Sequence, residues 1–257
     1  MTRPLPRLFV DAPLAAGARL PASREHWTYL TSVLRMGEGD EVLLFNGRDG
    51  EWRARLAPES RKSGALNVES HERTQSGGAD LLLLFAPLKH ARLDYMAQKA
   101  VEMGASALRP TLTRRTQVSR VNLDRLRANA IEAAEQCGVL RLPAILPECD
   151  LPSALAALEP ERLLVFCDEE AAQDDPCAAL DAHRGKDRLA VLIGPEGGFA
   201  PQERAMLAAR ANVARISLGP RILRADTAAV AALTLVQARL GDWPRRDGEA
   251  ERATMSP

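Results

Sequence analysis

The sequence lacks a net charge and a long apolar run. Its 34 lysines and arginines balance 34 aspartates and glutamates, so no overall field draws the chain onto nucleic acid or membrane. Residues 81–88 form an apolar run far shorter than the roughly 18 residues that a membrane helix needs. Pro4, Pro6, Asp11 and Pro13 interrupt the segment where a secretory signal would be apolar. We therefore expect no membrane partner and a cytoplasmic protein.

Cysteine is scarce and lacks the spacing of metal or redox motifs. The four cysteines lie 12, 18 and 10 residues apart with no Cys-x-x-Cys pair. We expect small reduced core residues, no metal and no disulfide, at Cys137, Cys149, Cys167 and Cys177.

The N-terminal part has the pattern of short strands. A hydrophobic fraction of 46% and a charged fraction of 26% are globular values, and 257 residues allow one large or two modest domains. Residues 41–45 run into the turn 46–50, and residues 51–56 then alternate apolar and polar side chains, which predicts a hairpin. Ser23 is placed to cap a short helix with Trp27, Leu30 and Leu34 on one side. We predict a small β-barrel domain over residues 1–75, ending at a Ser-Gly-Gly joint.

Beyond the joint, strand-like and helix-like segments alternate. Amphipathic helical stripes cover residues 93–101 and 123–137 and end at Gly104 and Gly138. Alternation of this kind predicts an α/β domain over 79–243, with a parallel sheet and helices on both faces. The charged tail 244–257 is expected to be disordered. The expected buried strands are residues 81–85, 107–112, 163–167, 189–193 and 213–218.

Two of the late strands end in glycine-rich loops. In open parallel sheets ligands bind beyond the carboxyl ends of the strands, and glycines let backbone groups approach a flat ligand closely. The first loop is Gly194 to Phe199, with Pro201 and Glu203 in the next helical turn. The second is Gly219 to Thr227, where Asp226 or Thr227 is the expected helix cap. A third exit follows Cys167 and carries Asp168, Glu169 and Glu170.

A nicotinamide enzyme is disfavoured by the same loops. No Gly-x-Gly-x-x-Gly occurs, and no acidic residue lies between Glu203 and Asp226, where a ribose-binding carboxylate would be expected.

The two loops carry a specific resemblance to a known family. Together they resemble the signature of SPOUT-class RNA methyltransferases, and within that class the RsmE family, which makes N3-methyluridine in 16S ribosomal RNA. The resemblance covers nearly the whole chain to Trp243, the first helices and a PUA-like barrel included. The stretches that carry it are 7–10, 33–40, 98–104, 132–138, 192–198 and 218–228.

This resemblance implies a deep trefoil knot in the C-terminal domain, a homodimer with shared active sites, and S-adenosylmethionine bound in the knot. The family usually has glutamate where this chain has Asp226, and often a serine cap where it has Ala200. The missing cap costs about 1 kcal/mol, partly offset by Pro201. The residues expected to contact the cofactor are Phe166, Cys167, Leu192, Ile193, Gly194, Pro195, Glu196, Gly197, Leu218, Gly219, Arg221, Ile222, Leu223 and Thr227.

The chemistry of uridine N3 selects the candidate catalytic residues. N3 becomes nucleophilic only when its proton leaves and charge spreads onto the flanking carbonyl oxygens, which a neighbouring arginine would stabilise. Arg221 and Arg224 are the candidate cations, and Glu196 and Asp226 the candidate proton acceptors. For Asp226 a helix-capping role is the stronger interpretation.

A local run of arginines offers a surface for RNA phosphates. Arg109, Arg114, Arg115, Arg120, Arg125 and Arg127 have only Asp124 as an acidic neighbour, although such runs are often merely solvated. Arg3, Arg7, Arg35, Arg53 and Arg55 could give the barrel a basic face. The predicted RNA contacts are Arg7, Arg35, Arg114, Arg115 and Arg120. Two alternatives stay open: a SPOUT enzyme acting on another RNA nucleotide, and a noncatalytic RNA-binding protein.

Overall fold

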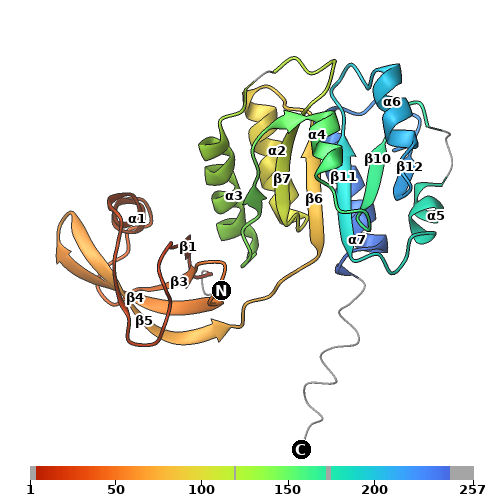
Figure 1. The fold of residues 1–257 in the computed structure, drawn as a ribbon. Coiled ribbons are helices and arrows are strands. Elements are labelled where there is room, and N and C mark those ends of the chain that lie inside the picture. Colours follow the sequence, from red (N-terminus) through yellow and green to blue (C-terminus); the bar gives the residue numbers. More distant parts are fainter. Residues whose placement is uncertain (1–3, 119, 172–174, 244–257) are drawn as a thin grey trace, which may run out of the picture. The chain divides into compact units, whose positions relative to one another are not determined.

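The structure, a computed structural model, describes residues 4–118, 120–171 and 175–243, which form two compact units (Figure 1). Unit 1 comprises Met1–Gly77 with Ala134–Leu142, and unit 2 comprises Gly78–Ala133 with Pro143–Pro257. The assignment of residues 134–142 to unit 1 could not be predicted from the sequence, because the helical stripe runs through to Cys137 without a break. The tail predicted to be disordered lies outside the described residues.

Unit 1 is built on a five-stranded sheet of order β1-β3-β4-β5-β2. β1 runs parallel to β3, and the other neighbours are antiparallel. The predicted hairpin is β3 and β4, with Val42 opposite Ala54 and Leu44 opposite Trp52, so this prediction is confirmed. The strands are β1 (Arg7–Phe9), β2 (Arg19–Pro21), β3 (Glu41–Phe45), β4 (Glu51–Ser60) and β5 (Ser63–Arg73).

A short helix covers the core of this sheet. α1 (Arg24–Thr28) begins where the Ser23 hydroxyl accepts a 3.0 Å hydrogen bond from the His26 amide, which confirms the predicted cap. It continues as a π-helix, η1 (Tyr29–Val33), that buries Leu30. Trp27 packs so tightly on β5 that a Cβ on Gly64 would come within 2.2 Å of its ring. Only glycine fits there.

Unit 2 contains a parallel sheet of order β12-β10-β11-β6-β7-β8, with β9 paired to β7. The predicted strands are present, and the last one ends at Ile216 instead of residue 218. The strands are β6 (Asp80–Phe85), β7 (Ala107–Leu112), β8 (Ala144–Ile145), β9 (Cys149–Asp150), β10 (Leu163–Cys167), β11 (Arg188–Ile193) and β12 (Val213–Ile216). The helices are α2 (His90–Glu102), α3 (Leu123–Cys137), α4 (Leu151–Ala156), α5 (Pro176–Asp181), α6 (Pro201–Ala208) and α7 (Ala225–Arg239).

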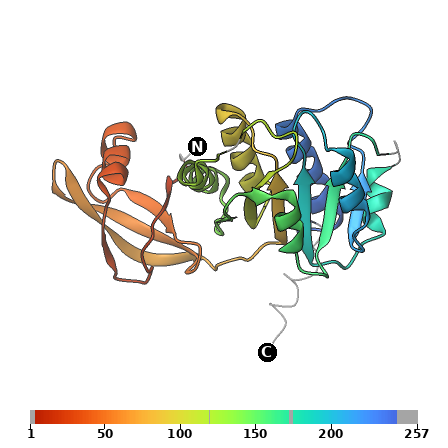
Figure 2. The same ribbon diagram turned by 45° about the horizontal axis from the view of Figure 1, so that its top comes forward.

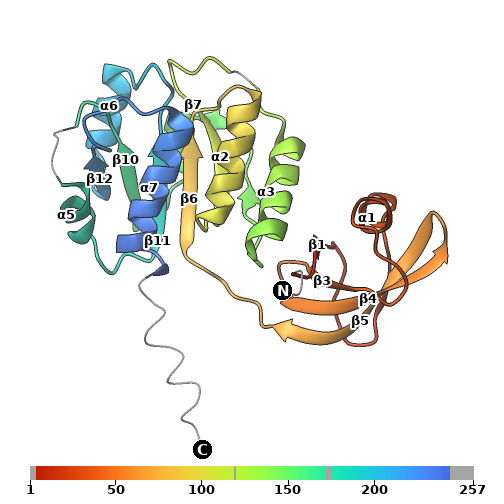
Figure 3. The ribbon, with the colours of Figure 1, turned by 180° about the vertical axis from the view of Figure 1, so that it is seen from behind.

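Helices cover both faces of this sheet, as the alternating pattern predicts. Leu81, Leu83 and Phe85 of β6 face one core with α2, α5 and α7, whereas Leu82 and Leu84 face the other core with α4 and α6. Figure 3 shows α2 and α7 in front of the sheet, with the arrowhead of β6 pointing to its upper edge. That edge, which Figure 2 turns toward the reader, carries the carboxyl ends of the parallel strands.

The cysteines do not share one environment. Cys167 is buried at the end of β10, whereas Cys149 and Cys177 are half-buried and Cys137 is exposed near the end of α3. The prediction that all four are core residues was therefore wrong for Cys137, because it lies on the solvent side of its helix. Within the described part of the chain, no helix is long and apolar enough to cross a bilayer.

Candidate active site

A cavity of about 310 Å³ lies where β10, β11 and β12 end. These three ends meet because β10 pairs on one side with β11, Cys167 beside Ile193, and on the other with β12, Cys167 beside Ile216. The two glycine-rich loops therefore lie on either side of the segment that follows Cys167. Of the predicted cofactor contacts, those that line the cavity are Cys167, Ile193, Gly194, Pro195, Glu196, Gly197, Leu218, Gly219, Arg221, Ile222 and Leu223.

Three glycines of these loops are there for different physical reasons. A Cβ on Gly194 would lie 2.5 Å from the ring of Phe199, so this glycine permits close packing behind the loop. Gly198 has a φ of 67° and leaves room for the Glu169 carboxylate, which a Cβ would strike. Gly219 has a φ of 98° and nothing within 4 Å of its would-be Cβ, so its backbone faces open space. A cradle of this kind presents bare backbone to a ligand.

Three predicted cofactor contacts do not line the cavity. The side chains of Phe166 and Leu192 point into the core on the α4 and α6 face, and the Phe166 ring packs edge-on against Phe199 at 5.0 Å. Because successive residues of a strand face opposite sides, the predicted cofactor contacts of Phe166 and Leu192 are left to their backbone groups. Thr227 lies in the first turn of α7, outside the lining.

The candidate catalytic residues separate into two pairs. Arg221 and Glu196 line the cavity, whereas Arg224 and Asp226 lie at the start of α7 outside the lining. The predicted cap at Asp226 or Thr227 was wrong. α7 begins at Ala225 with Arg224 as its N-cap, and the Asp226 carboxylate accepts a 3.0 Å bond from the Thr227 amide.

The cavity also contains residues to which sequence reasoning gave no role. The Asp168 carboxylate is fully buried and is held by Arg204 Nε at 3.1 Å and Arg215 Nε at 2.8 Å. Arg204 also binds the Phe199 carbonyl at 2.7 Å and Glu169 at 2.6 Å. The only sign of this cluster in the sequence was the row of acidic residues that follows β10. The lining residues not predicted are Asp168, Glu169, Gly198, Ser217, Pro220, Ala225 and Ala228.

Cys167 adds a buried thiol to the wall of the cavity. Burial, aided by the adjacent charge of Asp168, raises the pKa of this thiol to about 12. The thiol is therefore protonated at neutral pH.

The outer side of the Gly194–Gly198 loop is held by two arginines. Arg115 donates a 2.7 Å hydrogen bond to the Gly197 carbonyl, and Arg92 pairs with the Glu196 carboxylate at 3.3 Å. The next helix, α6, begins at Pro201, and the side chain of its N-cap residue, Ala200, cannot cap it. Glu203 supplies half of a capping box, because its Oε2 accepts from the Ala200 amide at 2.8 Å.

The predicted RNA contacts have unequal access to a ligand. Arg35, Arg114, Arg115 and Arg120 are exposed. The Arg7 side chain is only 11% exposed: it pairs with Glu51 at 2.6 Å, binds the carbonyls of residues 134, 135 and 139, and lies over the Phe45 ring. The donors of Arg7 are thus already used inside unit 1, which argues against the predicted contact with RNA.

Other arginines of the two basic surfaces are neutralised. Arg53 pairs with Glu41 and Glu72, and Arg55 with Glu41 and Glu69, so the barrel face is mixed in charge. Arg125 pairs with Asp94 of α2, an acid that is distant in sequence and was not counted beside Asp124. Arg3 lies outside the described residues.

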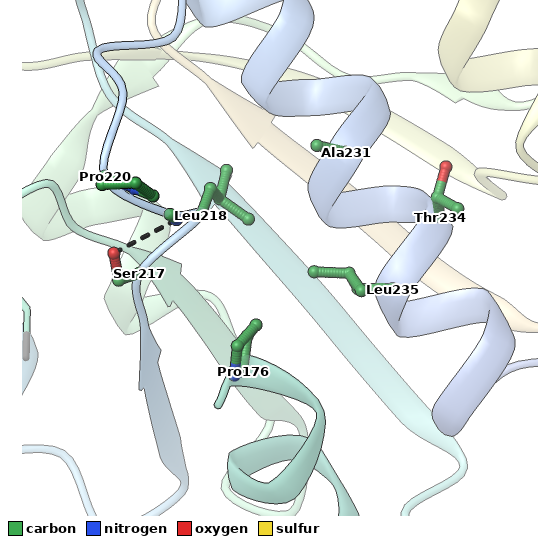
Figure 4. A pocket seen from close by; sticks show the side chains of 8 residues that line it. Pro176, Ser217, Leu218, Pro220, Ala231, Thr234 and Leu235 are labelled. Atoms are coloured by element: carbon green, nitrogen blue, oxygen red, sulfur yellow. Dashed lines mark hydrogen bonds between the residues drawn. The ribbon is translucent and has the colours of Figure 1, made fainter. Parts of the chain in front are cut away.

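A second hollow of about 500 Å³ lies beside the cavity and shares Ser217 to Pro220 with it. Figure 4 shows Leu218 and Leu235 of its wall facing each other across the space between the β12 loop and α7. Nearby, Ile222 is 98% exposed. Over the described ranges, no group of three or more His, Cys, Asp or Glu side chains could hold a metal ion.

Comparisons with known proteins agree with this architecture. A family model described as an RNA methyltransferase domain matches residues 76–237, and one described as an RNA methyltransferase PUA domain matches 28–69. Ribosomal RNA small subunit methyltransferase E of Rickettsia conorii is 29% identical over 90% of this chain and 94% of its own length. The protein of the same name from Synechocystis is 30% identical over 82% of this chain and 70% of its own.

Solved structures extend the match to the whole fold. Ribosomal RNA small subunit methyltransferase E of Neisseria gonorrhoeae, bound to S-adenosyl methionine, superimposes with a TM-score of 0.82 at 26% identity, covering 93% of this chain and 99% of that one. A Legionella pneumophila protein described as a putative methyltransferase, in complex with the same cofactor, gives 0.82 at 27% identity, covering 93% and 100%. The chain thus belongs to the ribosomal RNA small subunit methyltransferase E family, with a PUA domain before a SPOUT-type RNA methyltransferase domain.

Proposed function

We propose that this protein is an S-adenosylmethionine-dependent enzyme that methylates N3 of a uridine in 16S ribosomal RNA. The observation that carries the proposal is the glycine-lined cavity at the ends of β10, β11 and β12, with Arg221 in its wall. Two structures that superimpose on this chain with a TM-score of 0.82 hold S-adenosylmethionine, and the relatives named above act on small-subunit ribosomal RNA by name. The uridine N3 target comes from the family resemblance.

The cavity is suited to a nucleoside ligand. Bare backbone at Gly219 and the short side chains of Ala225 and Ala228 leave its walls open to a flat ring. We assign cofactor binding to the lining residues of the three loops, Cys167, 193–197 and 218–223. Phe166 and Leu192 support these loops from the core.

The bound cofactor supplies a methyl group from its sulfonium, the sulfur keeps the electron pair of the broken S–C bond, and a new N–C bond forms at uridine N3. Arg221 donates hydrogen bonds to the carbonyl oxygens beside N3 and stabilises the charge that develops as the proton leaves. Glu196 accepts that proton and is oriented by Arg92. Arg224 and Asp226 lie one turn further on and are assigned supporting roles at the start of α7.

We assign RNA binding to the exposed arginines. Arg114, Arg115 and Arg120 follow β7, whose carboxyl end lies on the same edge of the sheet as the cavity, and Arg35 lies in unit 1. Arg35 has a φ of 58°, an unusual conformation for a residue with a side chain. Arg35 directly follows Leu34, the C-cap of η1, and helices commonly end on a residue in this left-handed conformation.

We further propose that the active protein is a homodimer. The hollow beside the cavity (Figure 4) has a mostly apolar lining. Together with Ile222, which is 98% exposed and lies two residues after Pro220 of that lining, it gives a second copy a surface to cover next to the loops of the proposed active site. Because its substrate is ribosomal RNA, the enzyme would work in the cytoplasm.

Mass spectrometry of ribosomal RNA tests the proposal. We expect 16S RNA from cells without this gene to lack one N3-methyluridine that RNA from parent cells contains. The purified protein with S-adenosylmethionine should restore it. Methyl transfer to another nucleotide would point to a different SPOUT activity, and RNA binding without methyl transfer to a noncatalytic protein; either result would overturn the proposal.

A further inference from the structure

Glu203, in the first turn of α6, is a buried carboxylate shared between two distant segments. The residue as a whole is 5% exposed to solvent. One oxygen, Oε2, accepts from the Ala200 amide at 2.8 Å, and the other, Oε1, accepts from the Arg114 amide at 2.8 Å. Residues 114 and 203 are 89 positions apart in the chain. Capping of α6 requires only the first of these bonds.

The second bond fastens the loop after β7 to the helix that follows the cofactor loop. A tight turn places the Arg114 amide: the Thr113 amide donates to the Thr116 hydroxyl at 2.9 Å, and the Thr116 amide donates back to the Thr113 carbonyl at 3.1 Å. Through its two hydrogen bonds, the Glu203 side chain ties this turn to the start of α6.

The anchored turn contacts the cofactor loop a second time. Arg115, the next residue, reaches the Gly197 carbonyl at 2.7 Å, and its aliphatic stem lies 3.5 Å from the would-be Cβ of Gly197. The segment 114–115 thus touches the glycine loop at Gly197 and the start of α6 through Glu203.

From these contacts we infer that Glu203 is a positioning residue that couples cofactor binding to RNA binding. The inference rests on the proposed function, in which 114–115 contact RNA phosphates and 194–197 contact the cofactor. RNA bound to Arg114 and Arg115 holds the turn, the turn holds the glycine loop through Glu203 and Gly197, and the cofactor binds the preformed loop more tightly. By linkage, cofactor tightens RNA binding by the same factor.

Calorimetry with S-adenosylhomocysteine, which cannot donate a methyl group, measures this coupling without turnover. We expect unmethylated 16S RNA at saturation to lower the S-adenosylhomocysteine Kd of the wild-type protein by about fivefold or more. In Glu203→Ala the two Kd values should agree within about twofold. Glu203→Gln keeps one acceptor oxygen and should give an intermediate ratio.

Gln202→Ala is the matched control, because Gln202 is exposed on the same turn of α6. It should keep the wild-type ratio. Melting curves identify variants that fail to fold, and Glu203→Gln, nearly identical in shape, keeps the test valid if Glu203→Ala does fail. The inference would be overturned if RNA left the S-adenosylhomocysteine Kd of the wild-type protein unchanged. It would also be overturned if RNA lowered the Kd of a folded Glu203→Ala or Glu203→Gln variant by as much as it lowers that of the wild-type protein. Failure of cofactor binding itself gives a different result, since the wild-type protein alone would then not bind S-adenosylhomocysteine.

Discussion

At Gly219 the backbone leaves β12 with a φ of 98° and faces the cavity. We expect Gly219→Val to weaken S-adenosylmethionine binding by at least about tenfold, because the side chain enters the space proposed for the cofactor. The strained backbone should also cost about 1–2 kcal/mol of stability. Titration calorimetry and denaturant unfolding measure the two effects separately.

Gly185 provides the control for this substitution. It has a φ of 90°, nothing within 4 Å of its would-be Cβ, and a place outside the cavity. Gly185→Val should lose similar stability and keep its cofactor affinity. Equal affinity in both variants would contradict our placement of the cofactor.

Arg221 is the residue on which the proposed chemistry depends most. Arg221→Ala should lower kcat by about 10² to 10³, the usual loss when a donor to developing negative charge is removed. Arg221→Lys should recover part of it. Single-turnover methylation of ribosomal RNA gives the rate, and Arg184→Ala, at an exposed arginine paired with Asp181, is the control. A wild-type rate in Arg221→Ala would remove this residue from the mechanism.

The glycine loops and Arg7 differ in how well their roles could be predicted from the sequence. The glycine loops were predictable because glycine has few other reasons to cluster after buried strands. The internal role of Arg7 was not predictable, because the carbonyl groups and the Glu51 carboxylate that bind its side chain come from segments up to 132 positions away. An arginine that binds RNA and one that binds its own protein look alike in a sequence.

Among the elements, α6 begins without a side-chain cap. We expect Ala200→Ser to raise the free energy of unfolding by about 0.5–1 kcal/mol, because serine would accept from an amide of the first turn. Urea unfolding measures this gain, and a serine variant no more stable than the wild-type protein would count against a missing cap.

The start of β4 should make unit 1 sensitive to acid. Burial alone would raise the pKa of Glu51, but hydrogen bonds from Arg73 and Arg7 outweigh it and lower the pKa below its usual value of 4.5. The stabilisation is therefore present above about pH 4.5 and is lost as pH falls through the lower folded-state pKa. Denaturant unfolding of the wild-type protein across this range should show the loss.

The Glu51→Gln variant identifies the group responsible. At neutral pH it should cost about 3 kcal/mol or more, because Arg7 remains buried without its partner. The difference from the wild-type protein should shrink as pH falls below about 4.5. A difference that stays constant with pH would show that another group governs the acid response.

Whole elements were predicted better than their ends. Buried parallel strands stand out as apolar runs, so β6, β10 and β11 were placed within a residue or so. The start of α7 was misplaced because Asp226 has the residue type of a cap and the actual N-cap, Arg224, does not. Backbone geometry set that boundary.

For the whole molecule, the order of strands could not be read from the sequence. β10 lies between β11 and β12, so the strand with the acidic exit separates the two glycine loops. The spacing of apolar residues shows which face of a strand or helix is buried, but it does not show which strands lie next to one another in the sheet. The trefoil knot likewise comes only from the family resemblance and stays a prediction.

The proposed homodimer makes a prediction at the same scale. We expect the wild-type protein to sediment with twice the mass of the chain, and Ile222→Asp to shift it toward the single chain. Because Ile222 is 98% exposed, this change should not unfold the monomer. Met206→Asp, at a 40% exposed position on α6, should leave the mass unchanged. A wild-type monomer would contradict the dimer.

The burial of Cys167 bears on whether the proposed methyl donor could methylate the protein itself. Sulfur anions are better methyl acceptors than a uridine ring, and this thiol stands in the wall proposed to hold a methyl donor. With a pKa of about 12, on the order of one molecule in a hundred thousand carries the anion at pH 7. In the proposed enzyme, burial would therefore keep this thiol from competing with the RNA for the methyl group.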